Sequence, residues 1–205
     1  MSQTPLLHSS GLFYVNGKGE SFARVTSVLA MIRKPDVEKL RAMGRLNDQQ
    51  AKMDWGTAVH AEIDKERLAP PHSVPLMGGY VDSYRNFLKV HGLKVVARKR
   101  TVFSLKYKFA GTLDQEIQEK TKPYSLIVVD FKAGKFRPFE HPMQVNAYEF
   151  ARREMKLAPA DKLAVVELQP NGKFKPHWVD YRPESFLQAR HLYEGWRYYY
   201  ANHLE

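Results

Sequence analysis

The chain has 205 residues, of which 43% are hydrophobic, and this is enough for one full-sized domain with a buried core. Its 32 Lys and Arg against 22 Asp and Glu give a formal charge of +10, which favours a polyanionic partner, although a solvated basic surface explains it equally well. With no cysteine, disulfides, thiolate metal sites and iron–sulfur clusters are excluded. We expect neither a secretory leader nor a membrane span, and therefore a cytoplasmic location.

The first half of the chain predicts a small hairpin followed by helices. A turn at residues 16–19 (NGKG) links two short apolar runs, and Thr26 or Ser27 can cap the first helix. The glycine pair 78–79 precedes an amphipathic segment that Gly92 ends. The predicted elements are a hairpin of residues 12–15 and 21–23, and helices over about 26–33, 36–43, 48–68 and 80–91.

In the second half the apolar period changes to alternation, which indicates strands. The strands 95–103, 107–117 and 126–131 are expected to be antiparallel, with a connection that contains Pro123. A helix over 141–155, a hairpin of strands 163–168 and 174–179, and a helix over about 183–200 complete the list. We expect one α+β domain over 1–205, with a central mixed sheet, flanking helices and a helical N-terminal region.

Two aspartates lie near the ends of neighbouring predicted strands and converge at a sheet edge. Residues 111–114 read GTLD, residues 130–132 read DFK, and Asp130 ends the aliphatic run 126–129. Because side chains alternate along a strand, Asp130 and Lys132 share a face. A carboxylate at the end of a buried run needs a compensating cation, which Mg²⁺ or Mn²⁺ supplies. Two acids and a lysine at a sheet edge favour phosphodiester hydrolysis; ordinary exposed carboxylates are the alternative.

Four further features could serve the same site. His60 in a helical stretch is a candidate ligand, although a lone helix histidine is usually structural. Gln144 and Tyr148 share a helix face, which is also a common surface pair. Gly111 indicates a bulge or the close approach of another group. Lys132 could orient a water or stabilise charge on a phosphate, or be a plain strand-end lysine.

Taken in order, residues 56–60 (GTAVH), 111–114, 130–132 and 144–148 (QVNAY) resemble the motif series of RecB-type nucleases of the PD-(D/E)XK superfamily. The series GxxxH, GxxD, D/E-x-K and QxxxY spans roughly residues 50–155. The resemblance implies a restriction-endonuclease-like α/β/α core that hydrolyses DNA with a metal-activated water and no covalent intermediate. Among the varieties of this family without an iron–sulfur cluster, the chain resembles phage-type exonucleases and mitochondrial genome maintenance exonucleases. A phage origin would place its action in a host cytoplasm.

The resemblance also implies a role for each matched residue. Some relatives carry an acid in the strand before the GxxD segment, but here residues 97–101 read ARKRT, so we do not expect a second metal held by such an acid. The implied metal ligands are His60, Asp114, Asp130 and the Phe131 backbone carbonyl; the implied catalytic residues are Asp114, Asp130, Lys132, Gln144 and Tyr148.

The expected partner is DNA, in single-stranded form or at free ends, along with proteins of replication, repair or recombination. The N-terminal hairpin and helices, residues 12–68, are expected to form one wall of a substrate channel. An exonuclease is the favoured reading, and a structure-selective endonuclease or a non-catalytic DNA-binding module are the alternatives. The candidate substrate-binding residues are Thr57, Lys99, Arg100, Lys108, Gly111, Thr112, Lys135 and Arg137.

Overall fold

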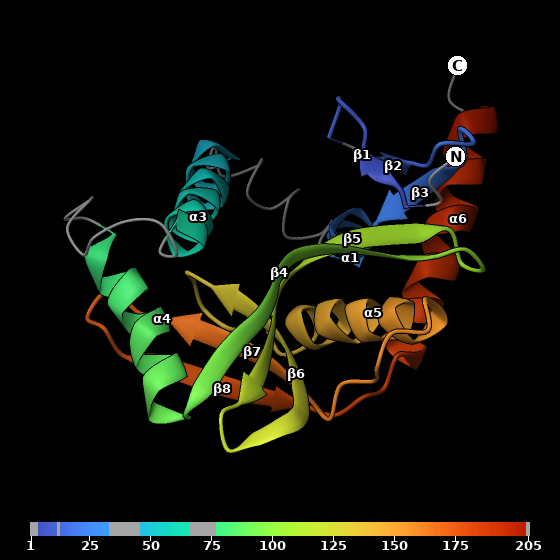
Figure 1. The fold of residues 1–205 in the computed structure, drawn as a ribbon. Coiled ribbons are helices and arrows are strands. Elements are labelled where there is room, and N and C mark those ends of the chain that lie inside the picture. The colour runs from blue at the N-terminus through green and yellow to red at the C-terminus, as the bar shows by residue number, and fades with distance from the viewer. Residues whose placement is uncertain (1–3, 12, 33–45, 66–76, 204–205) are drawn as a thin grey trace.

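The structure is a computed structural model that describes residues 4–11, 13–32, 46–65 and 77–203. The predicted helix over 36–43 therefore lies outside the described residues. One mixed sheet of eight strands is flanked by five helices in the described part of the chain (Figure 1). This confirms the predicted α+β class and is consistent with a restriction-endonuclease-like core.

The helices and strands follow the predicted order, except that a short strand, β1, which was not predicted, precedes the hairpin. They are β1 (Leu6–Leu7), β2 (Phe13–Val15), β3 (Ser21–Arg24), α1 (Val25–Ile32), α3 (Leu46–Lys65), α4 (Gly78–Val90), β4 (Leu93–Ser104), β5 (Phe109–Glu119), β6 (Lys122–Lys132), α5 (Glu140–Glu154), β7 (Lys162–Leu168), β8 (Phe174–Val179) and α6 (Glu184–His203).

Strand β5 pairs with three other strands, β3, β4 and β6. The strand order is β1-β2-β3-β5-β6-β7-β8, and β4 pairs with β5 off this path. The pairs β3–β5 and β6–β7 are parallel, whereas β4, β5 and β6 form the antiparallel set that the sequence predicts. Parallel neighbours need a crossover connection, and α5 provides it between β6 and β7.

The alternation of β6 explains how helices cover both faces of the sheet. Ile127, Val129 and Phe131 pack in a cluster that includes residues of α3 and α4. Val128, which points the other way, packs with Val145 of α5. Figure 1 shows α5 lying across the sheet beside α1 and α6, with α3 and α4 on the other side. Asp130 lies on the same face of β6 as Val128, so its carboxylate points toward α5.

Three local predictions were wrong. Helix α1 begins at Val25, directly after β3, so Thr26 and Ser27 lie inside its first turn and do not cap it. The glycine pair 78–79 forms the first two residues of α4 and does not precede it. A Cβ on Gly79 would stand 1.6 Å from the carbonyl oxygen of Pro170, so this position requires glycine.

The connection between β5 and β6 is shorter than predicted. Strand β6 already begins at Lys122 and contains Pro123, but its pairing with β7 starts only at Ile127. Proline is tolerated there because no β7 partner needs its missing N–H. Across the described residues, no helix has both the length and the apolar character that a membrane crossing requires.

Candidate active site

The candidate site lies in a gap along one edge of β5. Strand β4 pairs along β5 from Phe109 to Glu119, so β3 and β6 must share the opposite edge. There β3 reaches Ala110, and β6 pairs only from Gln115 onward. The GTLD segment, residues 111–114, therefore has no strand partner on this edge, although β4 pairs with Gly111, Thr112 and Leu113 on the other. Its backbone and side chains are therefore free to build a site inside the sheet.

The two aspartates meet where β5 and β6 diverge. The Phe131 N–H has no β5 carbonyl to bond and donates to Oδ2 of Asp114, at 2.9 Å. Both acids are buried, with 8% of Asp114 and 3% of Asp130 exposed. The sequence predicted that these residues share one site, and the structure brings them together.

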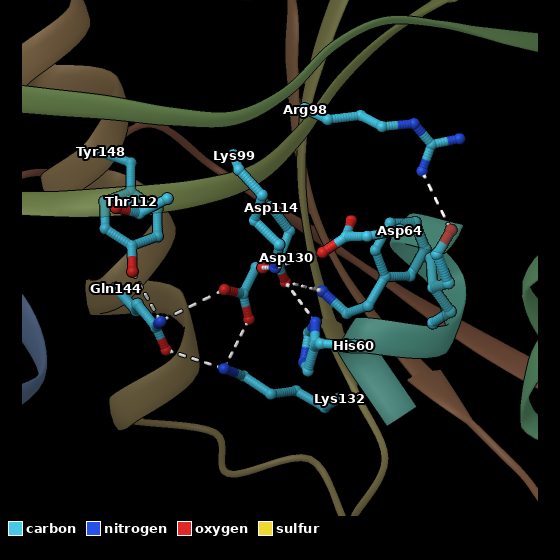
Figure 2. A network of polar contacts seen from close by, with 12 residues as sticks. His60, Asp64, Arg98, Lys99, Thr112, Asp114, Asp130, Lys132, Gln144 and Tyr148 are labelled. Atoms are coloured by element: carbon cyan, nitrogen blue, oxygen red, sulfur yellow. Dashed lines mark hydrogen bonds and ion pairs between the residues drawn. The ribbon is translucent and has the colours of Figure 1, made fainter. Parts of the chain in front are cut away.

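Lys132 and Gln144 enclose the Asp130 carboxylate. The Nζ of Lys132 lies 2.6 Å from Oδ2 of Asp130 and donates to Oε1 of Gln144 at 3.0 Å. The Gln144 amide in turn donates to Oδ1 of Asp130 and to the Tyr148 hydroxyl (Figure 2). Every polar atom of the Gln144 side chain is thus engaged, so this residue fixes the positions of Lys132 and Tyr148 relative to Asp130.

Helix α3 brings two more polar side chains to the acids. The Nδ1 of His60 lies 3.4 Å from Oδ2 of Asp114. Asp64, one turn later on the same helix, lies with its Oδ2 3.5 Å from the Nζ of Lys99. Lys99 also donates to Oδ1 of Asp114 at 2.9 Å, so it connects the helix to the strand (Figure 2).

The pKa values of the two acids are displaced in opposite directions. Burial raises the pKa of Asp114, but the attraction of His60, Lys99 and Lys132 outweighs it and holds the pKa below its ordinary value. Burial dominates at Asp130 and raises its pKa, and the nearby charge of Asp114 adds to the increase. The Lys132 ammonium lowers the pKa of Asp130, but by less than burial raises it.

The donors suit a hard divalent cation. Although Lys132 lies close to it, Oδ2 of Asp130 has no partner at a hydrogen-bonding angle among the described residues. Within the described residues, no three His, Asp or Glu side chains are grouped so that they could hold a metal ion. A lysine ammonium lies beside each aspartate, that of Lys99 at Asp114 and that of Lys132 at Asp130. The carboxylate oxygens nevertheless match the ligands that Mg²⁺ and Mn²⁺ prefer, whereas the His60 imidazole is a ligand typical of softer transition-metal ions. A buried carboxylate oxygen without a hydrogen bond fits a hard divalent cation.

Gly111 is required by the close approach of Tyr148. A Cβ at position 111 would lie 2.6 Å from Cε1 of Tyr148 and 3.2 Å from Cγ2 of Val25. The Tyr148 ring is buried, and burial raises the pKa of its hydroxyl well above the ordinary value, so the hydroxyl keeps its proton. The predicted close approach at Gly111 therefore comes from a side chain of the site itself.

Replacing Gly111 by alanine is expected to lower the free energy of unfolding by about 1–3 kcal/mol, because the new methyl group overpacks the Tyr148 ring. Gly134→Ala is the matched control, since nothing lies within 4 Å of a Cβ there, and it should change stability by less than about 0.5 kcal/mol. Urea unfolding of both variants measures the difference. Equal stabilities would mean that Tyr148 does not press on this position.

The candidate substrate-binding residues are not all at the site. Lys99 contacts Asp114, whereas Arg100 pairs with Glu116 at 3.1 Å. Lys108 directly precedes β5 and pairs with Glu20. It lies about 20 Å from Asp114 along the direction of the strand. The remaining candidates lie on α3 (Thr57), on β5 (Thr112, bonded to the Tyr14 hydroxyl) and in the exposed loop after β6 (Lys135 and Arg137).

Asp64 is the polar residue of this site that the sequence interpretation missed. It follows His60 by four residues, and residues at this spacing on a helix share a face. That spacing was a usable signal once His60 was a candidate. Arg98 donates to the Ile63 carbonyl and to the Tyr84 hydroxyl. These tertiary contacts have no signal in the local sequence.

No protein-family model matches the chain, and no curated protein does. Among solved structures it is similar to SSO0001, with 14% identity over 83% of this chain and 73% of that chain and a TM-score of 0.42. It is also similar to an alkaline exonuclease, LHK-Exo, from Laribacter hongkongensis, with 11% identity over 88% and 91% of the two chains and a TM-score of 0.47. Both TM-scores lie below 0.5, so the activity is inferred below from the chain's own residues.

Proposed function

We propose that the chain is a Mg²⁺- or Mn²⁺-dependent deoxyribonuclease of the RecB-like type that digests DNA from single-stranded or free ends. The observation that carries the proposal is the convergence of Asp114, Asp130 and Lys132 in the gap of β5. Asp130 there is buried, burial raises its pKa, and its Oδ2 has no partner at a hydrogen-bonding angle among the described residues. A site whose acids need a cation, beside a fixed lysine, supports phosphodiester hydrolysis.

The side chains divide the chemistry between them. His60, Asp114, Asp130 and the Phe131 carbonyl would hold the ion, which would supply positive charge to the phosphate and acidify a water. The Lys132 ammonium, fixed by Gln144, is placed to donate to a phosphate oxygen as negative charge builds on it. The Gln144 amide holds the Tyr148 hydroxyl, which keeps its proton and stays neutral beside the acids.

DNA would approach over the exposed basic side chains next to the site. Lys99 lies at the acids, and Lys135 and Arg137 lie in the exposed loop that follows Lys132. Contacts of this kind neutralise phosphates without reading sequence, so binding should weaken as salt increases. The N-terminal segment up to α3 is proposed as one wall of the channel, because α3 carries His60 to the acids.

A closed circular single strand and an end-labelled linear one, in Mg²⁺ and in Mn²⁺, test the proposal. An exonuclease digests the linear strand and leaves the circle intact, since it cannot begin without an end. Cutting of the circle would make the enzyme an endonuclease on the same core. No cleavage of either strand with either metal would contradict the proposal and indicate a binding role.

Replacing Lys132 by methionine is expected to lower kcat about 100-fold, because the ammonium at the phosphate is lost while the acids remain. Lys135→Met is the comparison, since this exposed lysine lies three residues further along the chain. It should raise KM and flatten the salt dependence of binding while kcat stays near the wild-type value. Steady-state cleavage rates separate the two, and an unchanged kcat in Lys132→Met would remove Lys132 from the chemistry.

A further inference from the structure

Lys99 occupies a strained position in the middle of β4. Its φ is +47°, in the left-handed region that residues with a Cβ seldom adopt. The β4–β5 pairing runs through Arg98 with Gln115 and Arg100 with Leu113, and it passes over Lys99 and Asp114. A regular strand would pair these two residues. The pairing omits these two residues but keeps the same register on both sides of them, so the irregularity is confined to the backbone at Lys99. Local strain of this kind clusters at functional sites.

The Lys99 ammonium lies between two carboxylates from different elements. The Nζ lies 2.9 Å from Oδ1 of Asp114 on β5 and 3.5 Å from Oδ2 of Asp64 on α3. The Asp64 carboxylate thus faces the same cation as an acid of the candidate active site, although no motif of the sequence includes it (Figure 2). One positive charge between two carboxylates is the arrangement in which a bridging divalent ion is also held.

Contacts behind Asp64 hold its helix near β4. Arg98, the neighbour of Lys99, donates to the Ile63 carbonyl at 3.3 Å and to the Tyr84 hydroxyl at 2.9 Å. The carbonyl precedes Asp64 in the chain, so Arg98 ties the last part of α3 to the strand that carries Lys99. The Lys99 side chain remains 39% exposed, which leaves its ammonium accessible to a substrate phosphate.

We propose that Lys99 is a built-in second cation of the active site. Its ammonium takes the place between Asp64 and Asp114 that a second divalent ion would otherwise bridge, so the site binds one divalent ion. Lys99 then presents a second lysine charge to the substrate phosphate, in addition to that of Lys132. This inference rests on the proposed nuclease function and adds a residue to it that the motif series does not contain.

The number of bound Mn²⁺ ions, measured by calorimetric titration and by electron paramagnetic resonance of the folded protein, tests the inference. The wild type is expected to bind one ion and Lys99→Met two, because the freed carboxylates can then hold another. The double variant Lys99→Met/Asp64→Asn should return to one ion. Lys94→Met, an exposed lysine on the same strand, is the control and should bind one ion as the wild type does.

Two ions in the wild type, or a single ion in Lys99→Met, would overturn the inference. If Lys99→Met does not fold, Lys99→Gly replaces it, since glycine adopts the left-handed backbone without strain and also lacks the ammonium. Asp130→Asn tests the proposed function separately. That variant should lose the first ion, and its failure to do so would contradict the metal site whatever the count in the Lys99 variants.

Discussion

Asp130→Asn should abolish DNA cleavage without lowering the stability of the fold. We expect a fall in kcat of about 1,000-fold or more, since losing several kcal/mol of transition-state stabilisation has this effect. The pKa of Asp130 is higher in the folded protein than in the unfolded chain. Keeping this carboxylate ionised at neutral pH therefore opposes folding, and the isosteric amide removes that cost.

The two consequences are measured on the same protein sample. Cleavage of labelled DNA should disappear, while urea unfolding at pH 7 should give a free energy equal to or above the wild-type value. Binding of DNA in the absence of cleavage should persist. A variant that is inactive and also clearly less stable would show that Asp130 serves mainly to support the fold.

Arg152→Met should cause the largest loss of stability among single substitutions outside the candidate site. Arg152 is 1% exposed and donates to Glu116 at 2.7 Å, to Glu149 at 2.5 Å and to the Ala158 carbonyl at 2.9 Å. Its removal leaves two buried carboxylates with fewer partners. Breaking a buried ion pair from one side costs about 3–5 kcal/mol, and this is the decrease we expect in the free energy of unfolding.

Arg153→Met is the matched control for Arg152. Arg153 bonds the same Glu149 carboxylate at 2.7 Å, but its side chain is 41% exposed and it stacks on Tyr181. Its loss should cost about 1 kcal/mol. Urea titration of both variants gives the comparison, and similar losses would mean that burial of Arg152 adds nothing to its ion pairs.

The Arg152 network also bears on the candidate site. Glu116 lies two residues from Asp114 on β5, and Glu149 follows Tyr148 on α5. Arg152 therefore holds α5, which carries Gln144 and Tyr148, against β5, which carries Asp114. We expect Arg152→Met to lose activity together with stability, in contrast to Asp130→Asn, where the two separate.

The sequence predicted the central part of the fold because two levels of pattern agree there. The aliphatic run before Asp130 marks a strand buried on both faces, and the structure covers it with α3 and α4 on one side and α5 on the other. The alternation of side chains then fixes the shared face of Asp130 and Lys132, and helical spacing aligns Gln144 with Tyr148. These relations are local, so they can be read without the tertiary structure.

The contribution of Lys99 could not be read in this way. As a residue of a basic strand it was a general candidate for phosphate binding, but its contacts depend on the backbone conformation at φ +47° and on the position of α3. Neither has a local signature. Gly79 is a similar case, since glycine is required there by the close approach of the Pro170 carbonyl, which is distant in the sequence.

The most direct test of the central claim is cleavage of an end-labelled linear DNA strand by the wild-type protein in Mg²⁺ or Mn²⁺, with and without excess chelator, beside Asp130→Asn. The account predicts release of label that requires the divalent ion and disappears in the variant. Cleavage that persists in chelator, or in Asp130→Asn, would contradict the assignment of Asp114, Asp130 and Lys132 as a metal-dependent phosphodiesterase site.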